Sequence, residues 1–166
     1  MNARSPAQRE LDEFEEDIEF QRRFWNIERV AWIVFALLIA AALAGLTGAG
    51  GPLAHATVQT PYGSIEYPRV ARWQATDDMI VRLSPTAGAI ADIELDRRFV
   101  ENFEIVSIQP GPASSTVTPQ GMRYSFDVAG GGEVVFQLRA LHPAFFPDAS
   151  VRVGDAETAM RPLILP

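Results

Sequence analysis

Residues 30–49 read VAWIVFALLIAAALAGLTGA, a run of twenty residues that contains no charged side chain. A helix of this length is about 30 Å long, which matches the apolar thickness of a lipid bilayer. The run therefore predicts one transmembrane helix, and the lipid bilayer is the first expected partner. It separates a short segment, residues 1–29, from a long one, residues 50–166.

Small side chains recur at every fourth position of this run. They are Ala36, Ala40, Ala44 and Gly48. In a helix they share one face, where a second transmembrane helix can approach closely. The alternative is that this face simply meets lipid. The run also has no ionisable side chain, which argues against a path for protons or ions through the span.

Arginine placement predicts the direction of the span. Arg22, Arg23 and Arg29 precede the run, and no arginine follows it until Arg69. Basic residues are in excess on the cytoplasmic flank of a span. We therefore expect a cytoplasmic N-terminus and an extracytoplasmic C-terminal part, at the cytoplasmic (inner) membrane of a bacterium.

A cleaved signal peptide is the competing interpretation, because residues 54–56 read AHA, the A-x-A form of a cleavage site. The leader before the run is long and acidic. The run itself exceeds the roughly 7–15 apolar residues of a signal peptide. The sequence therefore favours a retained anchor over a mature protein that begins at Thr57.

Residues 1–29 predict an amphipathic, acidic helix on the cytoplasmic side. Its apolar residues are spaced by three, four and seven positions, as on one face of a helix. They are Leu11, Phe14, Ile18 and Trp25. Acidic residues come early in the segment and basic residues late, which suits the helix dipole. The segment is either a docking helix for a partner or a solvated extension of the span.

Beyond the run, residues 50–63 predict a linker and residues 64–166 a β-domain. The domain holds seven or eight short segments in which apolar and polar residues alternate, separated by proline and glycine turns. The apolar positions of three such segments are Met79, Val81 and Leu83; Tyr124, Phe126 and Val128; and Val134, Phe136 and Leu138. This pattern predicts an immunoglobulin-like antiparallel β-sandwich, so the fold class is mainly β with one N-terminal transmembrane helix.

The domain contains no recognisable catalytic or metal-binding constellation. The chain has no cysteine, and its two histidines, His55 and His142, are expected in loops. Asp92, Glu94 and Asp96 alternate along one strand, so they predict either a Ca²⁺ site or a charged face that discourages edge pairing. We expect no cofactor, no metal ion and no enzymatic activity.

The most distinctive stretch of the domain is residues 65–75, IEYPRVARWQA. It brings together two arginines and two large aromatic residues: Tyr67, Arg69, Arg72 and Trp73. These residues predict contact with a partner or with lipid phosphates. The alternative is that the arginines pair with Glu66, Asp77 or Asp78. A net charge of −7 without a basic run argues against nucleic acid as a partner.

Three pieces of the chain resemble a group of uncharacterised bacterial single-pass membrane proteins with an exported β-sandwich domain. The pieces are Ile65–Ala75, Phe103–Pro110 and Gly121–Phe126. Members of that group are often encoded beside membrane proteins of the YetF type. The resemblance thus implies a partner in the same membrane, and it brings no catalytic residues with it.

These observations lead to one principal expectation and two alternatives. We expect a non-enzymatic membrane accessory protein, whose exported sandwich and transmembrane helix bind another membrane or envelope protein. The first alternative is a signalling or sensor subunit that relays ligand binding from the sandwich to the cytoplasmic helix. The second is an envelope hydrolase that acts through the carboxylates of Asp92, Glu94 and Asp96.

Overall fold

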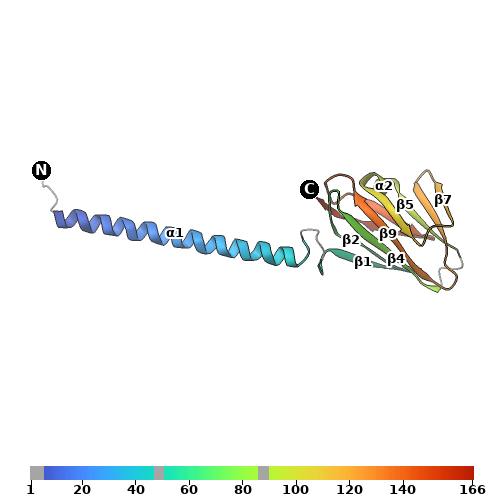
Figure 1. The fold of residues 1–166 in the computed structure, drawn as a ribbon, viewed down its shortest axis with the longest axis horizontal. Helices are drawn as coiled ribbons and strands as arrows, with labels where there is room; N and C mark the ends of the chain where they lie inside the picture. Colours follow the sequence, from blue (N-terminus) through green and yellow to red (C-terminus); the bar gives the residue numbers. More distant parts are fainter. Residues whose placement is uncertain (1–5, 47–50, 86–89) are drawn as a thin grey trace. The chain divides into compact units, whose positions relative to one another are not determined.

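The chain consists of one long helix followed by a β-domain (Figure 1), and a computed structural model describes it at residues 6–46, 51–85 and 90–166. The helix, α1, spans Pro6–Leu43. The chain divides into two compact units, residues 1–41 and 42–166, and each is described by itself.

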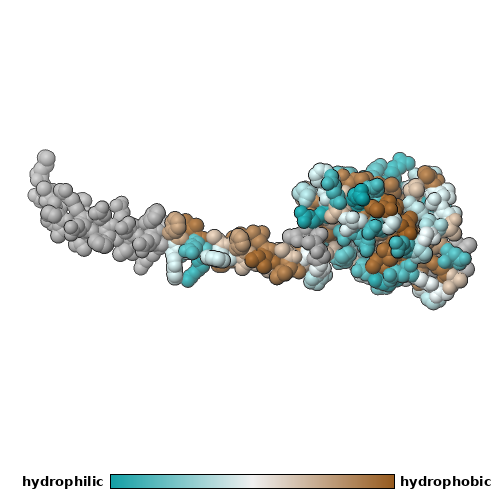
Figure 2. Space-filling view, in the orientation of Figure 1, coloured by the Kyte–Doolittle hydropathy of each residue, from teal (hydrophilic) through white to brown (hydrophobic). Residues whose placement is uncertain are grey.

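The apolar part of α1 is Phe24–Leu43, twenty residues that are long and apolar enough to cross a membrane. Figure 2 shows apolar side chains along this part of the helix. The helix ends at Leu43, within the run that the sequence predicts as the span. Gly45 causes this end, because it adopts the left-handed region with φ 91° and its N–H donates to the Ala42 carbonyl at 3.0 Å.

Thirteen strands and a second helix, α2 (Arg97–Asn102), follow within the described residues. The strands are β1 (His55–Thr60), β2 (Gly63–Pro68), β3 (Val70–Arg72), β4 (Thr76–Leu83), β5 (Ile90–Asp96), β6 (Phe103–Gln109), β7 (Ser114–Val117), β8 (Gly121–Asp127), β9 (Gly132–Ala140), β10 (Ala144–Phe145), β11 (Ala149–Val153), β12 (Ala156–Met160) and β13 (Leu163–Leu165).

The strands form two five-stranded sheets and one three-stranded sheet. The first large sheet has the order β1-β2-β4-β9-β6 and the second has the order β12-β11-β5-β8-β7. All neighbours in both large sheets are antiparallel. The third sheet has the order β10-β13-β3, and its β13–β3 pair is parallel. We call it the small sheet.

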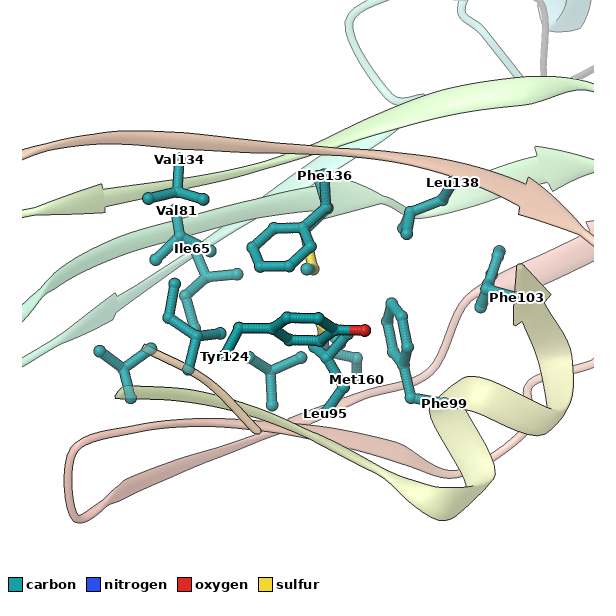
Figure 3. Close-up of a cluster of buried hydrophobic side chains, with 14 of the residues drawn as sticks. Ile65, Val81, Leu95, Phe99, Phe103, Tyr124, Val134, Phe136, Leu138 and Met160 are labelled. Carbon is teal, nitrogen blue, oxygen red and sulfur yellow. The ribbon is translucent and has the colours of Figure 1, made fainter. Parts of the chain in front are cut away.

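The core lies between the two large sheets, where alternate side chains of each strand meet. Figure 3 shows Phe136 and Leu138 on one side of this core and Tyr124 and Leu95 on the other. Tyr124 and Phe136 pack edge to face with ring centroids 5.8 Å apart. The inward residues of β4, β8 and β9 are those that the alternating pattern predicts, because every second side chain of a strand points to the same face.

The predicted fold class is confirmed: the chain is mainly β, with one N-terminal apolar helix followed by an antiparallel sandwich. The predicted linker over residues 50–63 differs from the structure, because His55–Thr60 is strand β1. This strand is an edge of its sheet and pairs only with β2. Its side chains are exposed or half-buried, so the strand does not require apolar residues at alternate positions. Its sequence, HATVQT, therefore shows little of the alternation that predicts a strand.

Candidate functional site

The four residues predicted as a contact site lie on β2, on β3 and directly after β3. Tyr67 belongs to β2, is half-buried and packs against the core. Arg69 precedes β3, Arg72 is its last residue and Trp73 follows it. Arg69, Arg72 and Trp73 are exposed, so these three side chains are free to contact a partner, whereas Tyr67 supports the fold.

The small sheet brings two distant parts of the chain beside these residues. In its register Leu163 faces Val70 and Leu165 faces Arg72. The Arg69 carbonyl accepts a hydrogen bond from Leu163 at 2.8 Å, and the Leu165 carbonyl accepts one from Trp73 at 2.7 Å. The third strand, β10, joins the sheet through the pairing of Phe145 with Leu163. Phe145 therefore lies two strands away from Arg69 and Arg72.

Trp73 is fixed at the rim of the small sheet by its ring nitrogen. The Nε1 atom donates to the Leu141 carbonyl at 3.0 Å, while the side chain remains 46% exposed. The backbone of Trp73 also forms a single parallel bridge with Ala140. Leu141 is thereby placed beside the indole, and its own side chain is exposed.

Phe145 and Phe146 extend this exposed region. Successive side chains of a strand normally point to opposite faces. Phe146, however, has φ 52°, a left-handed conformation that costs a non-glycine residue about 1–2 kcal/mol. As a result both aromatic rings are exposed, 79% for Phe145 and 59% for Phe146. We use the name small-sheet surface for Arg69, Arg72, Trp73, Leu141, Phe145 and Phe146.

Arg69 and Arg72 differ from the other arginines of the chain. Among the arginines whose side chains the structure describes, these two have no hydrogen bond, ion pair or ring contact, whereas each of the others has a partner. Of the three acidic partners that the sequence offers, two are engaged elsewhere and the third, Asp78, forms no ion pair with either arginine. Glu66 pairs with Arg82 at 2.8 Å, and Asp77 lies 3.8 Å from His55. The interpretation in which Arg69 and Arg72 pair with nearby carboxylates is therefore wrong.

The chain enters the sandwich next to the small-sheet surface. Ala44, the residue after α1, accepts a hydrogen bond from Leu53 at 3.0 Å. The carbonyl of Ala54 then accepts from the backbone N–H of Arg69 at 2.7 Å and of Val70 at 3.1 Å. Two hydrogen-bonded steps thus connect the end of α1 with the backbone of Arg69.

The close turn in this connection requires a glycine. Gly51 has φ 124°, and a Cβ atom there would lie 2.8 Å from the backbone of Gly45. A side chain at Gly51 would therefore collide with the end of the helical segment. Gly51, Leu53 and Ala54 therefore belong to the hydrogen-bonded structure of the second unit, residues 42–166.

Asp92, Glu94 and Asp96 are each engaged within the fold. Asp92 accepts a hydrogen bond from Ser125 at 2.6 Å, and Asp96 caps α2 by accepting one from the Phe99 N–H at 2.7 Å. No group of three or more potential metal-ligating residues occurs in residues 6–46, 51–85 and 90–166. These carboxylates therefore act as sheet and cap residues, and the geometry favours neither a Ca²⁺ site nor a carboxylate pair for hydrolysis.

Glu94 is the centre of an ionic cluster on the second large sheet. It is buried, and it accepts hydrogen bonds from the Thr118 hydroxyl at 2.6 Å and from Arg123 at 2.9 Å. Arg152 lies 3.9 Å away. The Thr118 hydroxyl, followed by the two guanidinium groups, lowers the pKa of Glu94 below its ordinary value. Sequence reasoning missed this cluster, because its members come from β5, β8, β11 and the loop after β7.

The two histidines do not form a site. His55 lies at the start of β1, beside Asp77, whose pKa is raised mainly by burial. His142 is exposed in the loop between β9 and β10.

Two of the four residues of the predicted packing face lie in α1 as the structure describes it. Ala36 and Ala40 lie within the helix, in its fully exposed apolar part. Ala44 lies in the turn after it, and Gly48 lies outside the described residues.

Comparisons with known proteins leave the family open. No protein-family model and no curated protein matches the chain. Among solved structures, the domain is similar to a cohesin module from a Clostridium perfringens family 33 glycoside hydrolase, with 11% identity, a TM-score of 0.45, and coverage of 68% of this chain and 97% of that one. A second similar structure is the sixth cohesin of Acetivibrio cellulolyticus scaffoldin B, with 13% identity, a TM-score of 0.35, and coverage of 58% and 86%. At these TM-scores neither similarity bears on function.

Proposed function

We propose that the chain is a single-pass, non-enzymatic membrane protein, which holds its sandwich domain at a bacterial inner membrane and binds another membrane or envelope protein. The observation that carries the proposal is the helix Phe24–Leu43, whose large apolar side chains are fully exposed. Trp32, Leu37 and Leu38, for example, are each more than 60% exposed. Exposed apolar surface of this extent is unfavourable in water and favourable in hydrocarbon.

The connection between helix and sandwich supports a retained anchor over a cleaved signal peptide. Cleavage before Thr57 would remove Ala54, which is buried and accepts two backbone hydrogen bonds. It would also shorten β1, in which Ala56 pairs with Tyr67. Ala54 and Ala56 therefore belong to the folded domain.

The orientation of the anchor follows from its basic flank. Arg22, Arg23 and Arg29 precede or begin the apolar helix, and Arg69 is the next arginine along the chain. This arrangement supports a sandwich outside the cytoplasm. Because the chain has no cysteine, a single Val117→Cys variant provides a test. A membrane-impermeant maleimide should label this variant in intact cells, and labelling only after lysis would contradict the orientation.

The partner is a second protein of the same membrane or of the envelope, and a YetF-type membrane protein is the first to test. Ala36 and Ala40 lie one helical turn apart on α1, which allows a neighbouring helix to pack closely. Within the described residues, the carboxylates and histidines that the sequence offers for catalysis are engaged in the fold or isolated. Binding is therefore the activity that the remaining features favour.

Co-purification tests the proposal. The chain is expressed at native level, extracted in a mild detergent and isolated with its bound proteins. The Ala36→Leu/Ala40→Leu variant should lose its partner several-fold, because larger side chains separate the helices. The matched control is Ala31→Leu/Ala42→Leu, which adds the same volume on the opposite side of the helix. Isolation of the wild-type chain alone, as a monomer, would refute the proposed function.

A sensor or signalling role is the second candidate, and one observation favours it. α1 continues without a break from Pro6 to Leu43, so the predicted amphipathic segment and the apolar segment form one helix. A continuous helix can transmit a rotation or a shift across a membrane. Deleting residues 1–24 without any change in phenotype would remove the basis for this role.

A further inference from the structure

The small-sheet surface combines features that the rest of the described sandwich does not share: two unpaired arginines, an anchored tryptophan and two consecutive exposed phenylalanines. We propose that this surface binds the phosphate groups of anionic lipids in the membrane that α1 anchors, and so docks the sandwich onto the headgroup layer. The inference rests on the proposed function, because it requires that α1 spans the bilayer.

The arginines supply the phosphate-binding chemistry. A guanidinium group donates two parallel hydrogen bonds to a phosphate, and Arg69 and Arg72 have all their donors available within the described residues. The acidic residue that follows the phenylalanines, Asp148, is shared by Arg161 at 2.8 Å and Arg98 at 3.8 Å. Asp148 therefore does not neutralise Arg69 or Arg72.

The connection to α1 distinguishes a membrane lipid from a soluble phosphate. When α1 spans the bilayer, Ala44 lies at the membrane surface, where the helix ends. Within residues 42–166, the hydrogen bonds from Leu53 to Ala44 and from Arg69 to Ala54 link the start of β3 to Ala44. Lipid headgroups are thus the phosphates that Arg69 meets at the highest local concentration.

The aromatic residues suit the same layer of the membrane. Tryptophan rings concentrate at the membrane–water boundary, because one part of the ring is polar and the rest is apolar. Trp73 keeps its N–H bonded to Leu141 and leaves its ring exposed. Phe145 and Phe146 are both exposed, and Phe146 adopts a strained left-handed conformation. Insertion of both rings into the headgroup layer would compensate for this strain.

The test places a fluorescent reporter at the surface of the full chain. Of the three tryptophans, Trp25 and Trp32 are replaced by phenylalanine, so that only Trp73 emits. The chain is reconstituted into vesicles of phosphatidylglycerol and phosphatidylcholine in equal parts, or of phosphatidylcholine alone, that contain a lipid with a nitroxide on its headgroup. Trp73 emission should shift to the blue and be quenched in the anionic vesicles, and less so in the neutral ones.

Substitution of the arginines then tests their role. At about 1 kcal/mol per arginine near an anionic surface, Arg69→Gln/Arg72→Gln should lower the ratio of docked to undocked domains roughly 30-fold. The matched control is Arg82→Gln/Arg97→Gln, which removes the same charge away from the small sheet and should leave the quenching unchanged. Arg82 lies at the opposite end of β4 from Trp73.

A second reporter shows whether quenching is specific to the small-sheet surface or occurs wherever the domain lies near the membrane. Val117→Trp, made in a chain without the other tryptophans, places the reporter on β7, which Figure 1 shows at the end of the domain away from the C-terminus. It should not be quenched. Equal quenching at both sites, or quenching of Trp73 that is unaffected by Arg69→Gln/Arg72→Gln, would overturn the inference.

Vesicle flotation, measured in the same samples, distinguishes a failure of lipid docking from a failure of the membrane anchor. A chain that floats with the vesicles but shows no quenching of Trp73 refutes lipid docking alone and leaves the small-sheet surface to a protein partner. A chain that does not float refutes the anchor itself, and with it the proposed function.

Discussion

Arg123 and Arg152 reach a buried carboxylate on the second large sheet, whereas Arg69 and Arg72, on the same sandwich, reach no acidic group among the described residues. The first pair belongs to a cluster in which Glu94 and Thr118 satisfy each other's hydrogen-bonding groups. The second pair lies beside exposed aromatic rings. Arginines with partners contribute to stability, and arginines without partners remain available for binding.

The largest effect is expected from removing the centre of the ionic cluster. Glu94→Ala removes the acceptor shared by the Thr118 hydroxyl and the half-exposed Arg123, which should lower the free energy of unfolding by about 2 kcal/mol. Urea unfolding of the full chain in a mild detergent, followed by the β-sheet signal in circular dichroism, measures the loss.

Glu104→Ala is the matched control for this variant. Glu104 is exposed and pairs with Arg139 at 3.4 Å. Its removal should cost no more than about 0.5 kcal/mol. Equal losses for both variants would show that the cluster around Glu94 has no special role in stability.

The cluster should also make the free energy of unfolding depend on pH in the acidic range. The lowered pKa means that folded Glu94 binds fewer protons than the unfolded chain does, so stability rises with pH in this range. The contribution is complete above 4.5, the ordinary pKa of the group, and disappears as pH falls through the lower folded value. A Glu94→Gln variant should show a flatter profile in urea unfolding across acidic pH, and two parallel profiles would contradict the assignment.

A smaller effect is expected from the hydroxyl of Thr118. Thr118→Val keeps the shape of the side chain but removes the hydrogen bonds to Glu94 and to the Gly121 N–H. The free energy of unfolding should fall by about 1 kcal/mol. In Glu94→Ala the same substitution should cost less, and a double-mutant cycle measures the difference.

The smallest effect on stability is expected at the small-sheet surface. Arg69→Gln/Arg72→Gln breaks no ion pair and should change the free energy of unfolding by less than about 0.5 kcal/mol, in either direction. The same double variant should reduce lipid docking strongly. A clear loss of stability in urea unfolding would mean that these arginines are structural, and the contrast with Arg123 and Arg152 would fail.

Much of the fold could be predicted because it depends on local pattern. Every second residue of β8, of β9 and of β4 from Met79 onward is apolar, and most of these residues belong to the core. The candidate site could be predicted only in part. Residues 65–75 indicated Arg69, Arg72 and Trp73, but nothing local indicated Phe145 or Phe146, which join them through pairing with β13, almost at the end of the chain.

The sequence by itself determined that this protein has an apolar helix and an alternating β-domain, because hydrophobic period and chain length are properties of neighbouring residues. Only the tertiary structure decided which charged side chains form ion pairs. Glu66 pairs with Arg82 and not with Arg69, because β2 and β4 are neighbours in the first large sheet. Pairing of charges depends on distances across strands, which spacing along the chain does not reveal. For this reason Arg69 and Arg72 are distinguished from the other arginines only in the folded domain.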